Sequence, residues 1–195
     1  MKAMKRWSTL FLLLLSGCAA PAGMQGRDHA TLFAPNRSLT LPSPADLGRS
    51  VQAMQLITVQ REGDSYVFEG QISITPERFL LIGTDPMGRR AMTVTWTEAG
   101  VTTETAPWMP AALRPDSMLA DIVMLYWPED VVRRAIAPAG AELTADARSR
   151  TVSIDGRDVL HVDYEQTGAS PWTGSLHYAN EGWGYRIAVR SVEVR

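Results

Sequence analysis

Three polar side chains alternate along one strand-like segment and could do chemistry together. His161, Asp163 and Glu165 lie two residues apart, so on a strand they share one face, and apolar residues occupy the opposite face. An imidazole and two carboxylates could bind a metal ion or transfer protons, and His177 could lie beside them on a neighbouring strand. A solvated strand face has the same pattern, and the sequence carries no nucleophile elbow, phosphate-binding glycine loop or His-Glu-x-x-His motif. We therefore expect no enzyme, with an envelope hydrolase or thioesterase using His161 as an alternative.

Cys18 is the only cysteine, so no disulfide can form within one chain. It follows a basic start and the short apolar run 10–15, and Leu15-Ser16-Gly17-Cys18 matches the bacterial lipobox, whose cysteine thiol carries diacylglycerol. The pattern predicts a signal peptide at 1–17, lipidation of Cys18 and a flexible tether over 18–38, rich in Ala, Gly and polar residues. An ordinary secretory signal with an incidental cysteine is the alternative.

Length and charge restrict the remaining chain. Removal of 1–17 leaves 178 of 195 residues, which suits a single domain at 39–195. Sixteen arginines then face 21 acidic residues, giving a net charge of −5, which argues against nucleic-acid binding. Ala19 follows the lipidated cysteine, where an aspartate would favour retention in the inner membrane. We expect a lipid-anchored protein of the outer membrane that faces the periplasm.

The segment 115–136 predicts two short helices. Its apolar residues recur at helical spacing, and only Asp121 interrupts them around the first helix. Pro128 ends the first helix and can begin the second. A helix that is apolar nearly all round is either buried on every side or faces an apolar cavity. Asp121 should pair with an arginine such as Arg89 or Arg90, or else point to water, because an unpaired buried carboxylate is costly.

Strand-like segments flank the helices in two blocks. Short turns make neighbouring strands antiparallel, and blocks of strands that do not alternate with helices indicate an α+β fold. We expect a strongly curved antiparallel sheet of about nine strands, a half-barrel covered by the two-helix lid. The expected strands are 51–61, 66–74, 78–84, 89–97, 101–105, 151–154, 159–165, 172–179 and 185–194.

The space between lid and sheet is either a solid core or an apolar cavity of lipid size. Composition cannot separate the two, because a cavity lined by Leu, Met and Trp resembles a core. Nine methionines and six tryptophans favour an adaptable apolar site. The expected lining is Phe68, Ile72, Met92, Val94, Trp96, Leu119, Ile122, Val123 and Tyr126.

The order of these segments resembles the LolA/LolB-like lipoprotein carriers and receptors. More closely, the chain is similar to a family of uncharacterised bacterial lipoproteins often encoded beside aryl-polyene biosynthesis. The resemblance covers about 39–194 and is carried by Leu41-Pro42 with the Gln55 strand, Asp85-Pro86-Met87-Gly88-Arg89, Met118-Leu119-Ala120-Asp121 through Tyr126-Trp127-Pro128, and Gly184-Tyr185-Arg186-Ile187.

This resemblance implies a half-barrel with a helical lid over an acyl-chain cavity. It also places Pro86, Met87 and Gly88 where the receptor's loop carries an exposed leucine that helps deliver lipoproteins to the membrane. The alternative for Met87 is a turn residue that folds back onto the sheet.

We therefore expect a non-catalytic outer-membrane lipoprotein that binds an acyl or polyene chain and aids its transfer or insertion. No cofactor is expected. The expected partners are a membrane lipid or lipoprotein acyl chain, the outer membrane through the anchor, and a periplasmic carrier protein. A scaffold lipoprotein with a solid core is the alternative.

Overall fold

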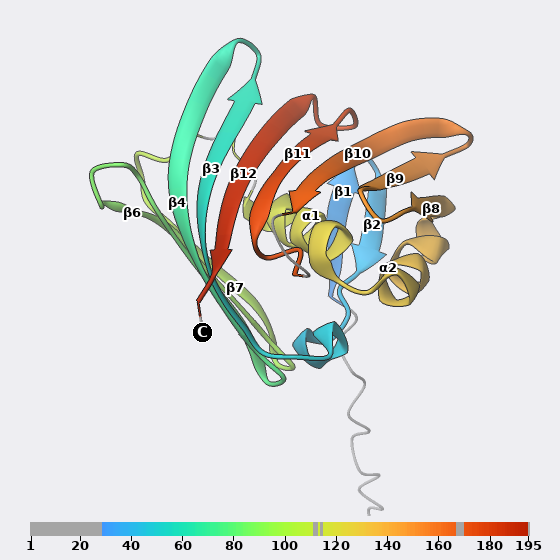
Figure 1. Ribbon diagram of the computed structural model, residues 1–195, viewed down its shortest axis with the longest axis horizontal. Coiled ribbons are helices and arrows are strands. Elements are labelled where there is room, and N and C mark those ends of the chain that lie inside the picture. The colour runs from blue at the N-terminus through green and yellow to red at the C-terminus, as the bar shows by residue number, and fades with distance from the viewer. Residues whose placement is uncertain (1–28, 111–112, 114, 167–169, 195) are drawn as a thin grey trace, which may run out of the picture.

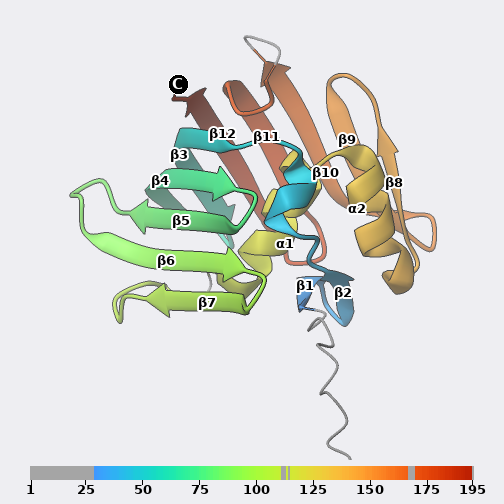
Figure 2. The ribbon, with the colours of Figure 1, turned by 90° about the horizontal axis from the view of Figure 1, so that it is seen from below.

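The computed structural model describes residues 29–110, 113, 115–166 and 170–194 and contains one large antiparallel sheet (Figure 1). Ten strands follow the order β7-β6-β5-β4-β3-β12-β11-β10-β9-β8. The sheet curls without closing, and helices α1 and α2 lie across it, which confirms the expected α+β half-barrel with a helical lid (Figures 1 and 2). The strands are β3 (Val51–Arg61), β4 (Asp64–Thr75), β5 (Arg78–Thr84), β6 (Arg90–Thr97), β7 (Gly100–Thr105), β8 (Ala141–Ala145), β9 (Ser149–Ile154), β10 (Arg157–Gln166), β11 (Gly174–Asn180) and β12 (Tyr185–Glu193).

The topology explains why the helices must cross the sheet. The first and last strands of the sheet, β3 and β12, pair at its centre, and from them two meanders run outward to the edges β7 and β8. The chain leaves the first meander at one edge and enters the second at the other. The connection between these edges therefore runs over the sheet, and it carries α1 (Pro115–Tyr126) and α2 (Glu129–Ile136).

Helix α1 is buried on every side. Four successive residues point in directions about 100° apart around the helix, and all are buried: Ala120, Asp121, Ile122 and Val123. A hairpin of β1 (Ala30–Ala34) and β2 (Arg37–Thr40) contacts α1 and buries Phe33 and Leu39 (Figure 2). The nearly all-round apolar character of α1 follows from this position between sheet and hairpin.

The hairpin and one edge strand were missed in the sequence. The stretch 30–38 lies within the expected flexible tether, yet most of it is β-structure, so the ordered part begins before residue 39. The strand β8 increases the sheet from about nine expected strands to ten. Both segments are short, and β8 has the sequence AELTA, which lacks β-branched residues apart from one threonine. Pairing with β9 and packing against α2, rather than local preference, make it a strand.

The buried C-terminal end of α1 has side-chain partners for its carbonyl groups. Arg150 donates to the carbonyl oxygens of Met124 and Trp127 at 3.0 and 2.8 Å. The Tyr164 hydroxyl donates to the carbonyl oxygen of Leu125 at 2.6 Å. The last carbonyls of a helix have no partner within it, so these bonds from β9 and β10 fix this end of the lid to the sheet.

The predicted signal peptide, the lipidated Cys18 and the first part of the tether lie outside the described residues. Within the described residues, neither helix has the length and apolar character needed to cross a membrane.

Candidate functional site

An apolar cavity lies between α1 and the strands β3 to β6 and β12. Its volume is about 70 Å³, and nearly all of its lining is hydrocarbon. The sheet contributes Ile57, Phe68, Leu81 and Ile187, while α1 covers them with Met118 and Ile122. Such a space can take an apolar group but offers few polar partners.

A pair of glycines lies in the sheet beneath this space. Gly70 of β4 and Gly83 of β5 stand opposite each other in the strand register, and both line the cavity. Added Cβ atoms would meet Ile57 Cδ1 at 3.2 Å from Gly70 and Met92 Cγ at 3.0 Å from Gly83. The side chains of Ile57 and Met92 therefore pack directly against the two glycines, and a larger residue at either position would force them to shift. We call this space the Gly70–Gly83 cavity.

The expected lining residues divide into two groups. Phe68, Met92, Ile122 and Tyr126 line the Gly70–Gly83 cavity. The other five are buried in the continuous core instead: Ile72, Val94, Trp96, Leu119 and Val123. The sequence analysis did not identify Met118, Leu125, Leu113, Ile187, Val189 or the two glycines as lining. Glycines inside two strand-like segments were the signal available for the hollow.

Aromatic side chains fill the rest of the concave face. Trp96 contacts Phe79 with ring centroids 6.1 Å apart and stacks on Trp127 of the helical connection at 5.6 Å. Aromatic rings bury large areas and pack well in these offset and tilted arrangements. These aromatic side chains therefore pack this half of the half-barrel as a core.

One polar cluster borders the cavity beside Tyr126. The Gln55 amide nitrogen donates to the Tyr126 hydroxyl at 2.9 Å and to the Ser191 hydroxyl at 3.0 Å. Burial raises the pKa of Tyr126 to about 12, so its hydroxyl stays protonated at neutral pH. The cluster links the lid to β3 and β12 at the centre of the sheet.

Asp121 forms a second polar cluster on the lid, and neither expectation for it is correct. It is 5% exposed and pairs with no arginine among the described residues; Arg89 binds Asp85 instead. The Tyr178 hydroxyl donates to Asp121 Oδ1 at 2.5 Å, and the Tyr185 hydroxyl donates to Oδ2. The Asn180 amide donates to Oδ1 at 3.3 Å. Burial raises the pKa of Asp121 to about 6, although these hydrogen bonds oppose the rise.

The β5–β6 hairpin presents Met87 to solvent. Its side chain is 83% exposed, so it does not fold back onto the sheet. Asp85 fixes the turn, because its Oδ1 accepts from the backbone N–H of Met87 at 3.0 Å and of Arg89 at 2.8 Å. The Arg89 guanidinium binds Asp85 at 2.7 Å and lies over the Trp108 ring at 4.6 Å. The exposed Met87 therefore stands on a rigid turn.

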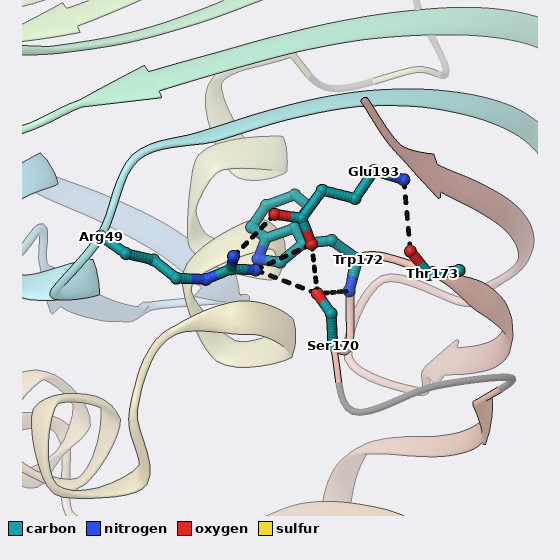
Figure 3. Close-up of polar contacts among 5 residues, drawn as sticks. All are labelled: Arg49, Ser170, Trp172, Thr173 and Glu193. Atoms are coloured by element: carbon teal, nitrogen blue, oxygen red, sulfur yellow. Dashed lines mark hydrogen bonds and ion pairs between the residues drawn. The ribbon is translucent and has the colours of Figure 1, made fainter. Parts of the chain in front are cut away.

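A polar network fixes the position of Trp172, which lies next to Tyr126 (Figure 3). Arg49 binds both carboxylate oxygens of Glu193 at 2.6 and 3.0 Å, and Ser170 donates to Glu193 at 2.6 Å. The Ser170 hydroxyl in turn accepts from the backbone N–H of Trp172 at 3.2 Å. Trp172 stacks on Tyr126 with centroids 3.9 Å apart. The network thus joins the start of β3 and the end of β12 to a side chain that supports the lid.

The histidine cluster lies on the outer face of the sheet, away from the Gly70–Gly83 cavity. His161 Nε2 is 3.2 Å from Asp163 Oδ2, and its Nδ1 is 2.9 Å from the Thr151 hydroxyl. Asp163 faces His177 across β10 and β11, which confirms that these side chains are neighbours. No group of three or more His, Cys, Asp or Glu residues is placed to bind a metal in the part of the chain that the structure describes.

Comparison with known families gives a match over most of the chain. The model of the family described as "Protein of unknown function (DUF3261)" matches residues 52–193. The matched segment contains both helices and almost the whole ten-stranded sheet, and it leaves out the β1–β2 hairpin. No curated protein matches the chain.

The pH dependence of stability should report on Asp121. Its pKa rises from 3.8 in the unfolded chain to about 6 on folding, so the folded state holds the proton more tightly. Its stabilising contribution is complete below about pH 4 and falls as pH rises towards 6, by about 3 kcal/mol in total. An Asp121→Asn variant should lose this part of the pH dependence in urea unfolding. An Asp163→Asn control, exposed on the outer face, should keep it; equal slopes for wild type and Asp121→Asn would show that Asp121 does not retain its proton.

Proposed function

This chain belongs to the DUF3261 family of proteins of unknown function, and we propose that it binds the acyl or polyene chain of a lipid in the Gly70–Gly83 cavity and aids its transfer. The observation that carries the proposal is an almost wholly apolar cavity between a curved sheet and a helical lid. Each methylene removed from water contributes about 0.8 kcal/mol, so ten methylenes give about 8 kcal/mol before ordering costs. Binding of this kind needs a dry space and no catalytic residue.

The lid must move for a chain to enter. A volume of about 70 Å³ is well below the range of roughly 300 to 1,000 Å³ of ligand pockets, so the proposal requires this structure to be a closed state that opens. Met118 and Ile122 are the α1 side chains that cover the cavity above the glycine pair. Outward movement of α1 would enlarge the cavity at that point. Arg150 and Tyr164 hold the C-terminal end of α1, and the Asp121 contacts hold its middle, so the part before Asp121, which carries Met118, is the part that opens.

Delivery to a membrane is the proposed role of Pro86, Met87 and Gly88. Met87 is an exposed apolar side chain at the tip of a hairpin, and Arg90 beside it is exposed. Gly83 and Met92, in the two strands that lead to this tip, also line the cavity. An apolar tip next to an apolar cavity would shorten the path of a chain through water.

The cellular setting follows from the lipobox and the resemblance to LolA/LolB-like proteins. Lipidation of Cys18 would anchor the protein in the outer membrane, facing the periplasm, with the folded domain on a tether. From there it could take a lipid or lipoprotein acyl chain from a periplasmic carrier. The half-barrel with a helical lid is the architecture that this resemblance implies, and the observed α+β sheet is consistent with it.

A scaffold lipoprotein is the second candidate, and a specific observation favours it. Five of the nine expected lining residues lie in the packed core. The outer face of the sheet also exposes Met54, Leu56 and Val192, which could contact another protein. The two candidates differ in whether a lipid enters beneath α1.

Blocking the cavity should prevent binding. Met118 lines the cavity and is partly exposed, so a Met118→Trp substitution should fill the space and lower the affinity for the apolar fluorophore N-phenylnaphthylamine about tenfold. A Met54→Trp control adds the same ring on the outer face and should bind normally. Equal binding by wild type and Met118→Trp, with both folded, would remove the cavity from the proposal.

Charging the hairpin tip should separate binding from delivery. A Met87→Glu variant should keep the fold and the fluorophore affinity, because the side chain is exposed and touches no core residue. It should slow lipid transfer to acceptor vesicles about tenfold, since a carboxylate enters lipid poorly. Val192→Glu, which charges another exposed apolar site, on β12, is the control. Unchanged transfer by Met87→Glu would exclude this loop from delivery.

A further inference from the structure

The Gly70–Gly83 cavity continues into a second, smaller space. This space has a volume of about 40 Å³ and shares five lining residues with the first cavity, namely Val59, Leu113, Met118, Asp121 and Ile187. Its other lining residues are Arg61 and Tyr185, which pair across β3 and β12. The free space therefore leads from the glycine pair past Asp121 towards the ends of two central strands. We call this smaller space the passage.

The passage ends at a polar notch between two hairpin turns. The β3–β4 and β11–β12 turns lie next to each other at one end of the sheet (Figure 1). The notch between them has a volume of about 370 Å³, and Arg61 and Tyr185 line it as well as the passage. The apolar cavity, the passage and the polar notch thus lie in sequence. An amphipathic molecule could place its apolar chain in the first two and its polar headgroup in the notch.

The charges in the notch are mixed. Arg61 and Arg186 supply positive charge, and Glu62, Asp64 and Glu181 supply negative charge. Arg61 Nε lies 3.3 Å from Glu62, and Arg186 lies 3.5 Å from Glu181. Three carboxylates against two guanidinium groups leave a net charge of −1 by this count. A purely anionic headgroup meets excess negative charge here, while a headgroup carrying both signs finds a partner for each.

We propose that this notch binds the zwitterionic headgroup of a phospholipid, with its phosphate at Arg61 and its primary ammonium among Glu62, Asp64 and Glu181, while an acyl chain runs through the passage into the Gly70–Gly83 cavity. A guanidinium carries five N–H donors, so Arg61 can bind phosphate oxygens while it keeps Glu62. The proposal rests on lipid binding in the cavity and names the class of lipid.

Arg61 has a special place in this arrangement. Its side chain is 21% exposed, against 72% for Arg186, and it borders both the passage and the notch. It is the first cationic group that a chain in the passage reaches on the way out. The hydrogen bond from Tyr185 to Asp121 holds that tyrosine in the wall of the passage. In the proposal these two residues shape the passage and do not bind the headgroup.

The test uses the mature chain with Cys18→Ser, so that no acyl anchor holds the protein in the membrane, and vesicles of equal parts phosphatidylethanolamine and phosphatidylglycerol with identical acyl chains. Protein is separated from the vesicles, and its bound lipid is identified by mass spectrometry. Wild type should carry mainly phosphatidylethanolamine. Arg61→Ala should carry about tenfold less of both lipids, because both contain the phosphate. The double variant Asp64→Asn with Glu181→Gln should bind lipid but lose the preference between them.

Matched controls come from the exposed first two residues of β10 in the same sheet. Arg157→Ala and Asp158→Asn remove charges from exposed positions there and should behave like wild type. Bound lipid in equal amounts in wild type and Arg61→Ala, with no headgroup preference, would overturn the headgroup site and leave chain binding intact. Absence of any lipid from wild type would instead contradict the proposed function, and the headgroup site with it.

Discussion

The pairing of β3 with β12 at the centre of the sheet is the constraint on which the structure depends. It places β7 and β8 at opposite edges, so the chain between them has to cross the concave face. That crossing segment is buried by the sheet on one side and by the β1–β2 hairpin on the other. Its first helix must then be apolar around almost its whole circumference, and this is the most distinctive feature of the sequence.

Burial of the crossing helix has a cost that side chains from distant strands offset. Its last carbonyl groups accept hydrogen bonds from Arg150 and Tyr164, and its one carboxylate, Asp121, accepts them from Tyr178, Tyr185 and Asn180. A buried polar group without a partner costs about 1 to 3 kcal/mol, so these contacts decide where the lid can sit. They hold the C-terminal end and the middle of α1. The space beneath Met118 and Ile122, over two glycines, remains unfilled.

Much of the fold could be predicted from local patterns. Alternation in β4 identified Phe68 and Ile72 as inward-facing, and helical spacing with Pro128 identified both helices. The site could be predicted only in part. Asp121 finds its partners about 60 residues away on β11 and β12, and the glycine pair matters because the β4–β5 register sets Gly70 against Gly83. Neither fact can be derived from spacing along the chain, since both depend on how strands far apart align.

The central claim is that a lipid chain occupies the space beneath α1. Native mass spectrometry of the mature chain with Cys18→Ser, which has no acyl anchor and can be purified from the periplasm without detergent, tests it most directly. The account predicts a population heavier than the protein by the mass of one lipid, and that lipid should leave when the protein unfolds. Protein that repeatedly carries no lipid, and takes none up from vesicles, would contradict the account and favour a lipoprotein with a solid core.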